Sequence, residues 1–307
     1  MSVRRLLITA VALAATSLLL AACGSSSGGT GAASATKPTI TIGTQNFGED
    51  EIVANLYGDV LSHAGYPVKV EPSLGTRAVV VAAIEHGQID LEPDYAASLL
   101  GYLHGGKILP AADQIATAVA ADQTALSPFG VTALPASKAL DTNVFAVTKA
   151  TATQDHLTTI SSLAPYASKM TLGGPPECPT FAGCEPGLKS VYGLNFASFK
   201  SLDEAGPLSV AALKNGEVQV VELFSSDGNV LSNNFVALTD NKHLEGADYI
   251  TPVIRKSVDT SAVRAALAGV DNALTTDAIS KLNLDVTADK QQPAAVAETW
   301  LKSEGLI

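Results

Sequence analysis

Two aromatic side chains occupy matching positions in a sequence motif that occurs twice and is here called the repeated phrase. Residues 82–95 and 211–224 align without a gap: two alanines and an aliphatic residue, two polar residues, a glycine, alternating polar and aliphatic residues, and a final aromatic. The pattern predicts a helix ended by a glycine, then a short buried strand with Tyr95 or Phe224 at its carboxyl end. Ligands bind at that edge of open α/β sheets. The two copies therefore predict a cleft with an aromatic on each wall; the alternative is a chance match between two common α/β connections.

The sequence lacks the spacings that common enzyme classes use. Its five histidines are scattered without a paired spacing, and it has no Gly-x-Ser-x-Gly elbow, phosphate-binding loop or His-Glu-x-x-His motif. These absences predict a chain that is not an enzyme and uses neither a cofactor nor a metal ion. The alternative from a different class is a cell-envelope enzyme, which would need an acid/base or nucleophile pair in the cleft.

The beginning of the chain has the composition of a targeting signal followed by a flexible tether. Two arginines precede an apolar run, 6–20, that is too short and has the wrong flanks for a membrane span. Small residues then precede Cys23, an order typical of bacterial lipoprotein signal peptides. We expect removal of residues 1–22, lipidation of Cys23 and anchoring on the extracytoplasmic face of the cell membrane; an ordinary secretory signal is the alternative. The Gly-, Ser- and Ala-rich stretch 23–37 would be a flexible tether.

Acidic residues outnumber basic ones in the rest of the chain. The formal charge of the whole sequence is −11, and loss of residues 1–22, which hold Arg4 and Arg5 but no acid, changes it to −13. Nucleic acids and anionic lipids repel a body of this charge. We therefore expect a small-molecule ligand and no nucleic-acid partner.

Two further cysteines lie close together. Cys178 and Cys184 stand in a loop rich in proline and glycine. In an exported protein such a pair predicts a disulfide, which would contribute about 2 kcal/mol by closing a short loop. A metal site, the alternative, would need further ligands, and no histidine is near in the sequence.

The body of about 270 residues reads as alternating strands and helices, which predicts an α/β protein with mainly parallel sheets. A short strand is expected after the glycine of each copy of the phrase. The other expected strands are 39–42, 67–71, 144–148, 170–172, 234–238 and 249–254, with an extended segment at 196–202. The expected helices are 48–64, 76–86, 158–167, 186–192, 207–215, 261–274, 276–284 and 292–302.

Short motifs along the body carry a resemblance to a known family. In chain order they are 43–49, 74–77, 89–95, 141–143, 173–177, 186–189, 192–194, 225–228 and 252–255. As an ordered set they resemble the osmoprotectant (glycine betaine/choline/carnitine) substrate-binding proteins of ABC importers, the ProX/OpuC type.

The resemblance implies a two-lobe periplasmic-binding-protein fold of type II, with the ligand cleft between the lobes. Residues 38–141 and 248–307 would form lobe 1, and residues 142–247 lobe 2. The protein would be a monomer that closes around a compatible solute and delivers it to an ABC permease in the membrane.

The resemblance also implies a binding site in which aromatic faces hold a quaternary ammonium by cation–π attraction. Tyr95 and Phe224 stand at cage positions, and Asp141 stands where a main-chain oxygen faces the cation. The expected ligand-binding residues are Gln45, Asn46, Phe47, Tyr95, Ser98, Asp141, Asn143, Glu177, Phe181, Phe224, Ser225 and Tyr249.

Three positions depart from the family pattern. Asn143 stands where relatives have a cage tyrosine, Phe181 where some carry a carboxylate-binding arginine, and the match slips by one residue around Tyr249. These departures keep open a non-cationic ligand, such as a polyol or a phenolic compound, bound for uptake or for sensing.

Overall fold

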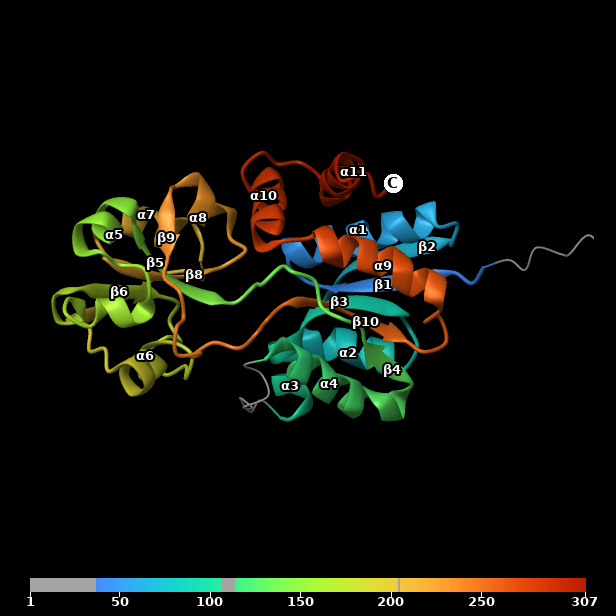
Figure 1. The fold of residues 1–307 in the computed structure, drawn as a ribbon, viewed down its shortest axis with the longest axis horizontal. Coiled ribbons are helices and arrows are strands. Elements are labelled where there is room, and N and C mark those ends of the chain that lie inside the picture. The colour runs from blue at the N-terminus through green and yellow to red at the C-terminus, as the bar shows by residue number, and fades with distance from the viewer. Residues whose placement is uncertain (1–36, 106–113, 204) are drawn as a thin grey trace, which may run out of the picture. The chain divides into compact units, whose positions relative to one another are not determined.

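The computed structural model describes residues 37–105, 114–203 and 205–307 (Figure 1). The expected signal peptide, the lipidation site Cys23 and all of the expected tether except its last residue lie outside the described residues. Within the described ranges no helix has the length and apolar character needed to cross a membrane.

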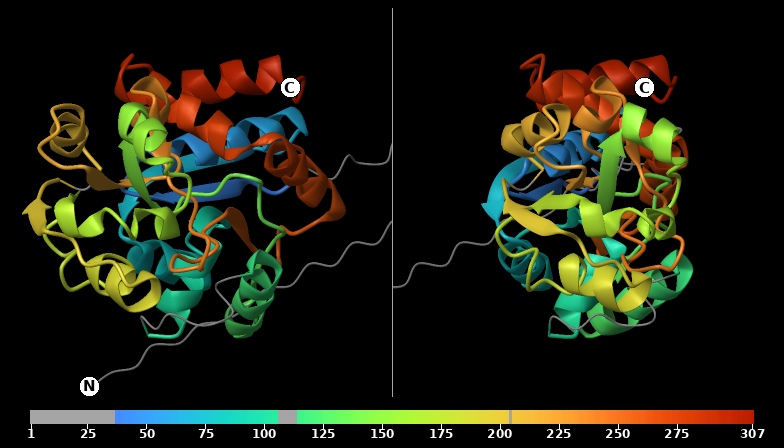
Figure 2. Two further views of the ribbon diagram at one scale, coloured as in Figure 1. Left: turned by 60° about the vertical axis from the view of Figure 1, so that its left-hand side comes forward. Right: turned by 90° about the vertical axis from the view of Figure 1, so that its left-hand side faces the viewer.

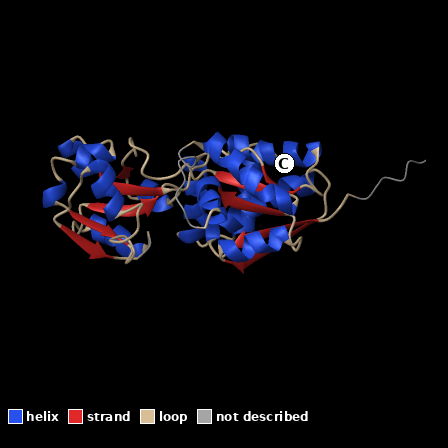
Figure 3. Cartoon of the chain, turned by 90° about the horizontal axis from the view of Figure 1, so that it is seen from below, coloured by secondary structure: helices blue, strands red, loops and turns tan. Residues whose placement is uncertain are grey.

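Ten described strands form two five-stranded sheets, each flanked by helices (Figure 3). The strand order of the first sheet is β2-β1-β3-β10-β4, and that of the second sheet is β7-β6-β8-β5-β9. The first sheet contains β1 (Ile40–Gln45), β2 (Val68–Gly75), β3 (Leu91–Tyr95), β4 (Val131–Ala133) and β10 (Ile250–Arg255). The second contains β5 (Asn143–Thr148), β6 (Thr171–Gly174), β7 (Ser198–Ser201), β8 (Val220–Phe224) and β9 (Phe235–Ala237).

Both sheets are mixed, but four strands of each run in one direction and one runs against them, so the expectation of mainly parallel sheets holds apart from β5 and β10. In the first sheet β1 runs parallel to β2 and β3, but β10 is antiparallel to β3 and β4. In the second, β6 is parallel to β7 and β8, but β5 is antiparallel to β8 and β9. A crossover helix on one sheet imposes parallel pairing. Strands β5 and β10 instead each follow a strand of the other sheet, and that constraint does not apply to them.

Helices cover both faces of the first sheet (Figure 1). One face packs against the C-terminal helices and α1, which lie side by side in both views of Figure 2. The other face packs against α2, α3 and α4. The first group is α1 (Gly48–His63), α9 (Ser261–Ala273), α10 (Thr276–Thr287) and α11 (Pro293–Ser303); the second is α2 (Arg77–Glu85), α3 (Ala96–Leu103) and α4 (Ile115–Leu126).

Two hydrophobic clusters lie on opposite faces of the second sheet. Alternation along β5 sends Phe145 and Val147 into one cluster and Ala146 into the other. Along β8, Val220 joins the cluster of Phe145, and Val221 joins the cluster of Ala146. The helices of this part are α5 (Lys149–Asp155), α6 (Glu185–Tyr192), α7 (Pro207–Lys214) and α8 (Gly228–Ser232).

Most expected elements are confirmed with ends that differ by four residues or fewer, but the helix expected over 158–167 is wrong. Two short 3-10 helices, η3 (Ile160–Leu163) and η4 (Ala167–Lys169), take its place. Pro165 lies between them and has no N–H to donate to the preceding turn, which a continuous helix would require. Sequence analysis also gave no bounds for α3, α4, α5, α8 and β4; the α5 segment contains two threonines, which are weak helix formers.

Candidate functional site

The repeated phrase folds as its pattern predicts. In the first copy, α2 ends before Gly87, which has φ +74°, and β3 ends at Tyr95. In the second, α7 ends before Gly216, also at φ +74°, and β8 ends at Phe224. The left-handed backbone at both glycines turns the chain from helix to strand. Each aromatic is therefore the last residue of a strand.

A cavity of about 260 Å³ lies at the carboxyl end of β8. Four of the expected ligand-binding residues line it: Asn143, Glu177, Phe181 and Phe224. Asn143 and Phe224 are direct neighbours across the β5–β8 pairing, and Phe181 is 43% exposed. The volume falls just below the range of roughly 300–1,000 Å³ usual for small-molecule pockets, which indicates a small ligand.

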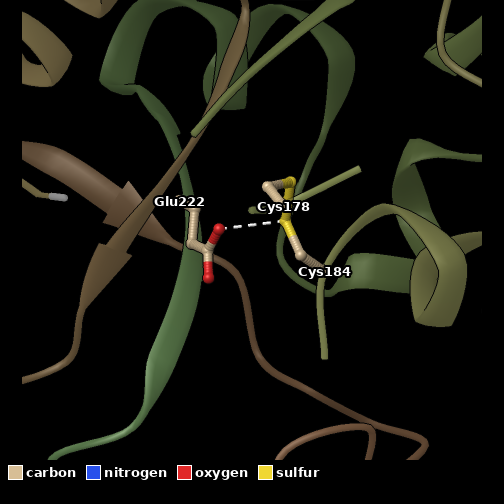
Figure 4. A group of neighbouring side chains, drawn as sticks. All are labelled: Cys178, Cys184 and Glu222. Atoms are coloured by element: carbon tan, nitrogen blue, oxygen red, sulfur yellow. Dashed lines mark hydrogen bonds between the residues drawn. A yellow bond between two sulfur atoms is a disulfide. The ribbon is translucent and has the colours of Figure 1, made fainter. Parts of the chain in front are cut away.

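A disulfide joins Cys178 to Cys184, as the sequence predicts, and Cys178 lines the cavity (Figure 4). The Glu222 carboxyl group points at this disulfide, with Oε2 2.9 Å from Cys184 Sγ. A disulfide sulfur has no hydrogen, so a hydrogen bond over this distance needs a proton from the carboxyl group. The three groups lie close enough together to hold a metal ion. Because the two sulfurs are bonded to each other, however, neither is a thiolate ligand.

Two acids near the cavity were missed by the sequence analysis. Glu222 is 6% exposed and lines the cavity. Glu245 accepts a hydrogen bond from Asn143 Nδ2 at 3.4 Å, and its Oε1 is buried without a hydrogen-bond partner among the described residues. Burial, followed by the charges of Glu222 and Asp240, raises the pKa of Glu245 to about 9. The alternation of β8 could have revealed Glu222, since it shares a strand face with Phe224.

The expected residues of the first sheet lie at the carboxyl ends of β1 and β3. Tyr95 is only 5% exposed, and its hydroxyl donates a hydrogen bond to Glu49 Oε1 at 2.8 Å. Burial, together with the nearby acids, raises the pKa of Tyr95 well above its usual value. Phe47 lies 5.9 Å from Tyr95 between ring centroids and is 38% exposed, and Asn46 is exposed beside it. Phe47 therefore offers more aromatic surface to a ligand than Tyr95 does.

Gln45 lies in a group of buried acids rather than at an open surface. Its main-chain N–H donates to Asp50 Oδ2 at 2.5 Å, and its Nε2 lies 3.5 Å from Asp94 Oδ1. Arg77 pairs with Asp94 through Nε at 2.9 Å. Burial raises the pKa values of Asp50 and Asp94, although the charge of Arg77 opposes the shift. These contacts engage the side chains of Gln45 and Arg77 with acids of the protein.

Tyr249 directly precedes β10, and Ser98, which lies in α3, contacts the segment that leads into this strand. Ser98 donates from its main-chain N–H and from Oγ to the two oxygens of Asp248, both at 2.7 Å. The carbonyl oxygen of Tyr249 accepts a hydrogen bond from Ala96, and Tyr249 forms an isolated bridge with Leu140. Ser98 therefore positions this connecting segment.

Asp141 and Ser225 lie where the other connecting segment enters the second sheet. Ser226 Oγ donates to Asp141 Oδ1 at 2.6 Å, and Ser225 Oγ donates to the carbonyl oxygen of Leu140 at 2.8 Å. Burial, and next the charge of Glu49, raises the pKa of Asp141 well above its usual value. Both side chains are therefore engaged by the protein.

The model of the OpuAC family, described as the substrate binding domain of an ABC-type glycine betaine transport system, matches residues 38–303. The chain belongs to this family. The family consists of binding proteins of ABC transporters, which confirms the prediction that the chain is not an enzyme.

Individual relatives share about a quarter of their residues with the chain. A glycine-betaine-binding protein of Pseudomonas aeruginosa is 26% identical over 281 residues, which are 88% of this chain and 89% of the relative. The carnitine transport binding protein OpuCC of Listeria monocytogenes is 25% identical over 309 residues, which are 95% of this chain and 94% of the relative.

Solved structures confirm the fold. A crystal structure of a glycine betaine/carnitine/choline ABC transporter protein matches with a TM-score of 0.80 at 22% identity, covering 87% of this chain and 99% of that one. The two mixed sheets with their helices are therefore the type II periplasmic-binding-protein fold, as predicted.

Proposed function

We propose that the protein captures a quaternary-ammonium compatible solute outside the cytoplasm and delivers it to an ABC permease. The observation that carries the proposal is the cavity at the end of β8. It joins two phenylalanines, Phe181 and Phe224, to the buried acid Glu222. Aromatic faces attract a cation that is unable to donate hydrogen bonds. The functions of the relatives, glycine betaine binding and carnitine transport, fit such a ligand.

The proposal includes a lobe assignment for each part of the chain. Lobe 1 would hold residues 38–141 and 248–307, and lobe 2 residues 142–247. The two sheets, whose strands lie within these ranges, support the assignment. Ligand binding would close the lobes, with the segments around Asp141 and Asp248 as hinges. The main-chain hydrogen bond of 2.9 Å between these two residues would keep the hinges together.

The proposal also includes a membrane anchor at Cys23 and two groups of ligand contacts. The cavity would supply Asn143, Glu177, Phe181 and Phe224, and the exposed Phe47 would approach from the first sheet. Gln45, Asn46, Tyr95, Ser98, Asp141, Ser225 and Tyr249 would support the site through the contacts described above or touch the ligand after closure.

Calorimetry on the full-length protein in detergent tests the proposal. Glycine betaine, choline and carnitine are titrated beside polyols and phenolic compounds. We expect saturable binding of at least one quaternary amine. Phe224→Ala should weaken it by about 1–3 kcal/mol through loss of an aromatic wall. Phe129→Ala, at a 47% exposed phenylalanine that does not line the cavity, is the matched control. Binding of polyols or phenolics alone would refute the quaternary-ammonium proposal.

A further inference from the structure

One asparagine of α10 contacts two segments that are far from it in the chain. We propose that Asn283 is a positioning residue for the ligand site, which ties the segment after Phe224 to the strand end that carries Tyr95. Asn283 is not among the described residues that line the cavity, so it would act on the ligand through these segments. This inference rests on the proposed function, because it assumes that the cavity at the end of β8 binds the ligand.

The side-chain amide of Asn283 bridges an acid of α1 and the main chain after β8. Its Nδ2 donates to Glu49 Oε2 at 2.6 Å and to the main-chain oxygen of Ser226 at 3.0 Å. An amide nitrogen carries two hydrogens, so each acceptor receives one of its own. A main-chain oxygen can only accept, and therefore the nitrogen of the amide, not its oxygen, faces Ser226.

Glu49 connects this bridge to Tyr95. Glu49 lies in the first turn of α1 and is 7% exposed. While Oε2 accepts from Asn283, Oε1 accepts from the Tyr95 hydroxyl at 2.8 Å. Each carboxyl oxygen of Glu49 therefore has a donor. Because Tyr95 is the last residue of β3, the bridge reaches the carboxyl end of a strand in the first sheet.

Ser226 connects the bridge to the wall of the cavity. It follows Phe224 by two residues and is buried. Asn283 holds its main-chain oxygen, and its Oγ donates to Asp141 Oδ1 at 2.6 Å. Ser226 is therefore held through both its main chain and its side chain, which restricts the positions that Phe224 can take.

Close packing of α8 on α10 brings this segment within reach of Asn283. A Cβ at Gly228 would lie 2.7 Å from the main-chain oxygen of Ser280 and 2.7 Å from Leu284 Cβ. Glycine, which has no Cβ, permits this approach. Ser280 and Leu284 lie on α10 on either side of Asn283 in the sequence, so the same contact places the amide against the main chain of Ser226.

Loss of the bridge should weaken ligand binding although the residues of the cavity wall are unchanged. A wall residue that moves among several positions occupies the binding-competent position for a smaller fraction of the time, and the apparent Kd rises in proportion. Asn283 supplies two hydrogen bonds to partly buried acceptors. Removing both should lower the competent fraction about tenfold.

Asn283→Leu in the full-length protein tests the inference, because leucine is similar in size and branching but has no N–H to donate. Calorimetry with glycine betaine, choline and carnitine should show an affinity about tenfold lower than that of the wild type for each probe that the wild type binds. Hydrogen exchange without ligand should become about tenfold faster over residues 225–232. Asn283→Ala, which also lacks the donors, is the second variant if Asn283→Leu fails to fold.

Tyr57→Phe is the matched control for a loss of stability alone. It also removes a buried hydrogen bond between α1 and a C-terminal helix, from the Tyr57 hydroxyl to Asp271 Oδ1 at 2.8 Å. Affinity and exchange over residues 225–232 should stay as in the wild type. Unchanged or tighter binding by the Asn283 variants, or unchanged exchange, would overturn the inference and leave the proposed function standing. A wild type that binds none of the three probes would overturn both.

Discussion

Replacing Asp122 with asparagine should remove part of the pH dependence of stability. Asp122 lies on α4 with no exposed surface, and both of its carboxyl oxygens lack hydrogen-bond partners among the described residues. Burial, followed by the charges of Asp94 and Asp248, raises its pKa from 3.8 to about 8. The folded protein therefore holds a proton here at pH values where the unfolded chain has released it.

The sign and size of the effect follow from proton linkage. A group whose pKa is raised in the folded state stabilises the fold fully below its unfolded pKa, and that contribution is lost as the pH rises through its folded pKa. For Asp122 the loss spans about pH 4 to pH 8. At about 1.36 kcal/mol per pH unit, the group should destabilise the protein by about 4 kcal/mol between pH 5 and pH 8. Asparagine keeps the shape of the neutral acid and cannot lose a proton.

Urea unfolding at pH 5 and pH 8 measures this difference. The free energy of unfolding of Asp122→Asn should fall by about 4 kcal/mol less than that of the wild type between the two pH values. Asp289→Asn, at an exposed position after α10, is the control and should follow the wild type. A difference below about 0.5 kcal/mol between Asp122→Asn and the wild type would refute the reasoning, because it would mean that Asp122 is ionised in the folded protein.

Three other changes test the packing. Tyr57→Phe removes a buried hydroxyl that donates to Asp271 Oδ1 at 2.8 Å; urea unfolding should show a loss of about 1–3 kcal/mol, and no loss would mean that the bond contributes nothing. Gly228→Ala would place a Cβ 2.7 Å from a main-chain oxygen of α10, so thermal denaturation should show a loss of about 1–3 kcal/mol; an unchanged midpoint would show that α8 moves freely away. Reduction of the Cys178–Cys184 disulfide should cost about 2 kcal/mol in urea unfolding with and without a dithiol, and coincident curves would contradict the loop-closure argument.

The elements of the fold were largely predictable because their signals are local. Helix α1 carries its apolar residues at helical spacing and ends before Gly65, which has φ +84°. The two copies of the repeated phrase located β3 and β8 and placed Tyr95 and Phe224 at their ends. The direction of β5 and β10 was not predictable in this way. It depends on pairing between segments that are far apart in the chain, and no local pattern records it.

The features of the ligand site can also be separated into those that local sequence patterns determine and those that depend on distant segments. The sequence by itself determined the aromatic residues at the two strand ends, the disulfide pair and the family whose pattern the chain follows. Only the tertiary structure decided that Tyr95 is buried against Glu49 and that Glu245 lies beside Asn143. Alternation and spacing are properties of neighbouring residues, so the sequence displays them directly. The burial and charge of a carboxyl group depend on what distant segments bring next to it, and folding alone creates those surroundings.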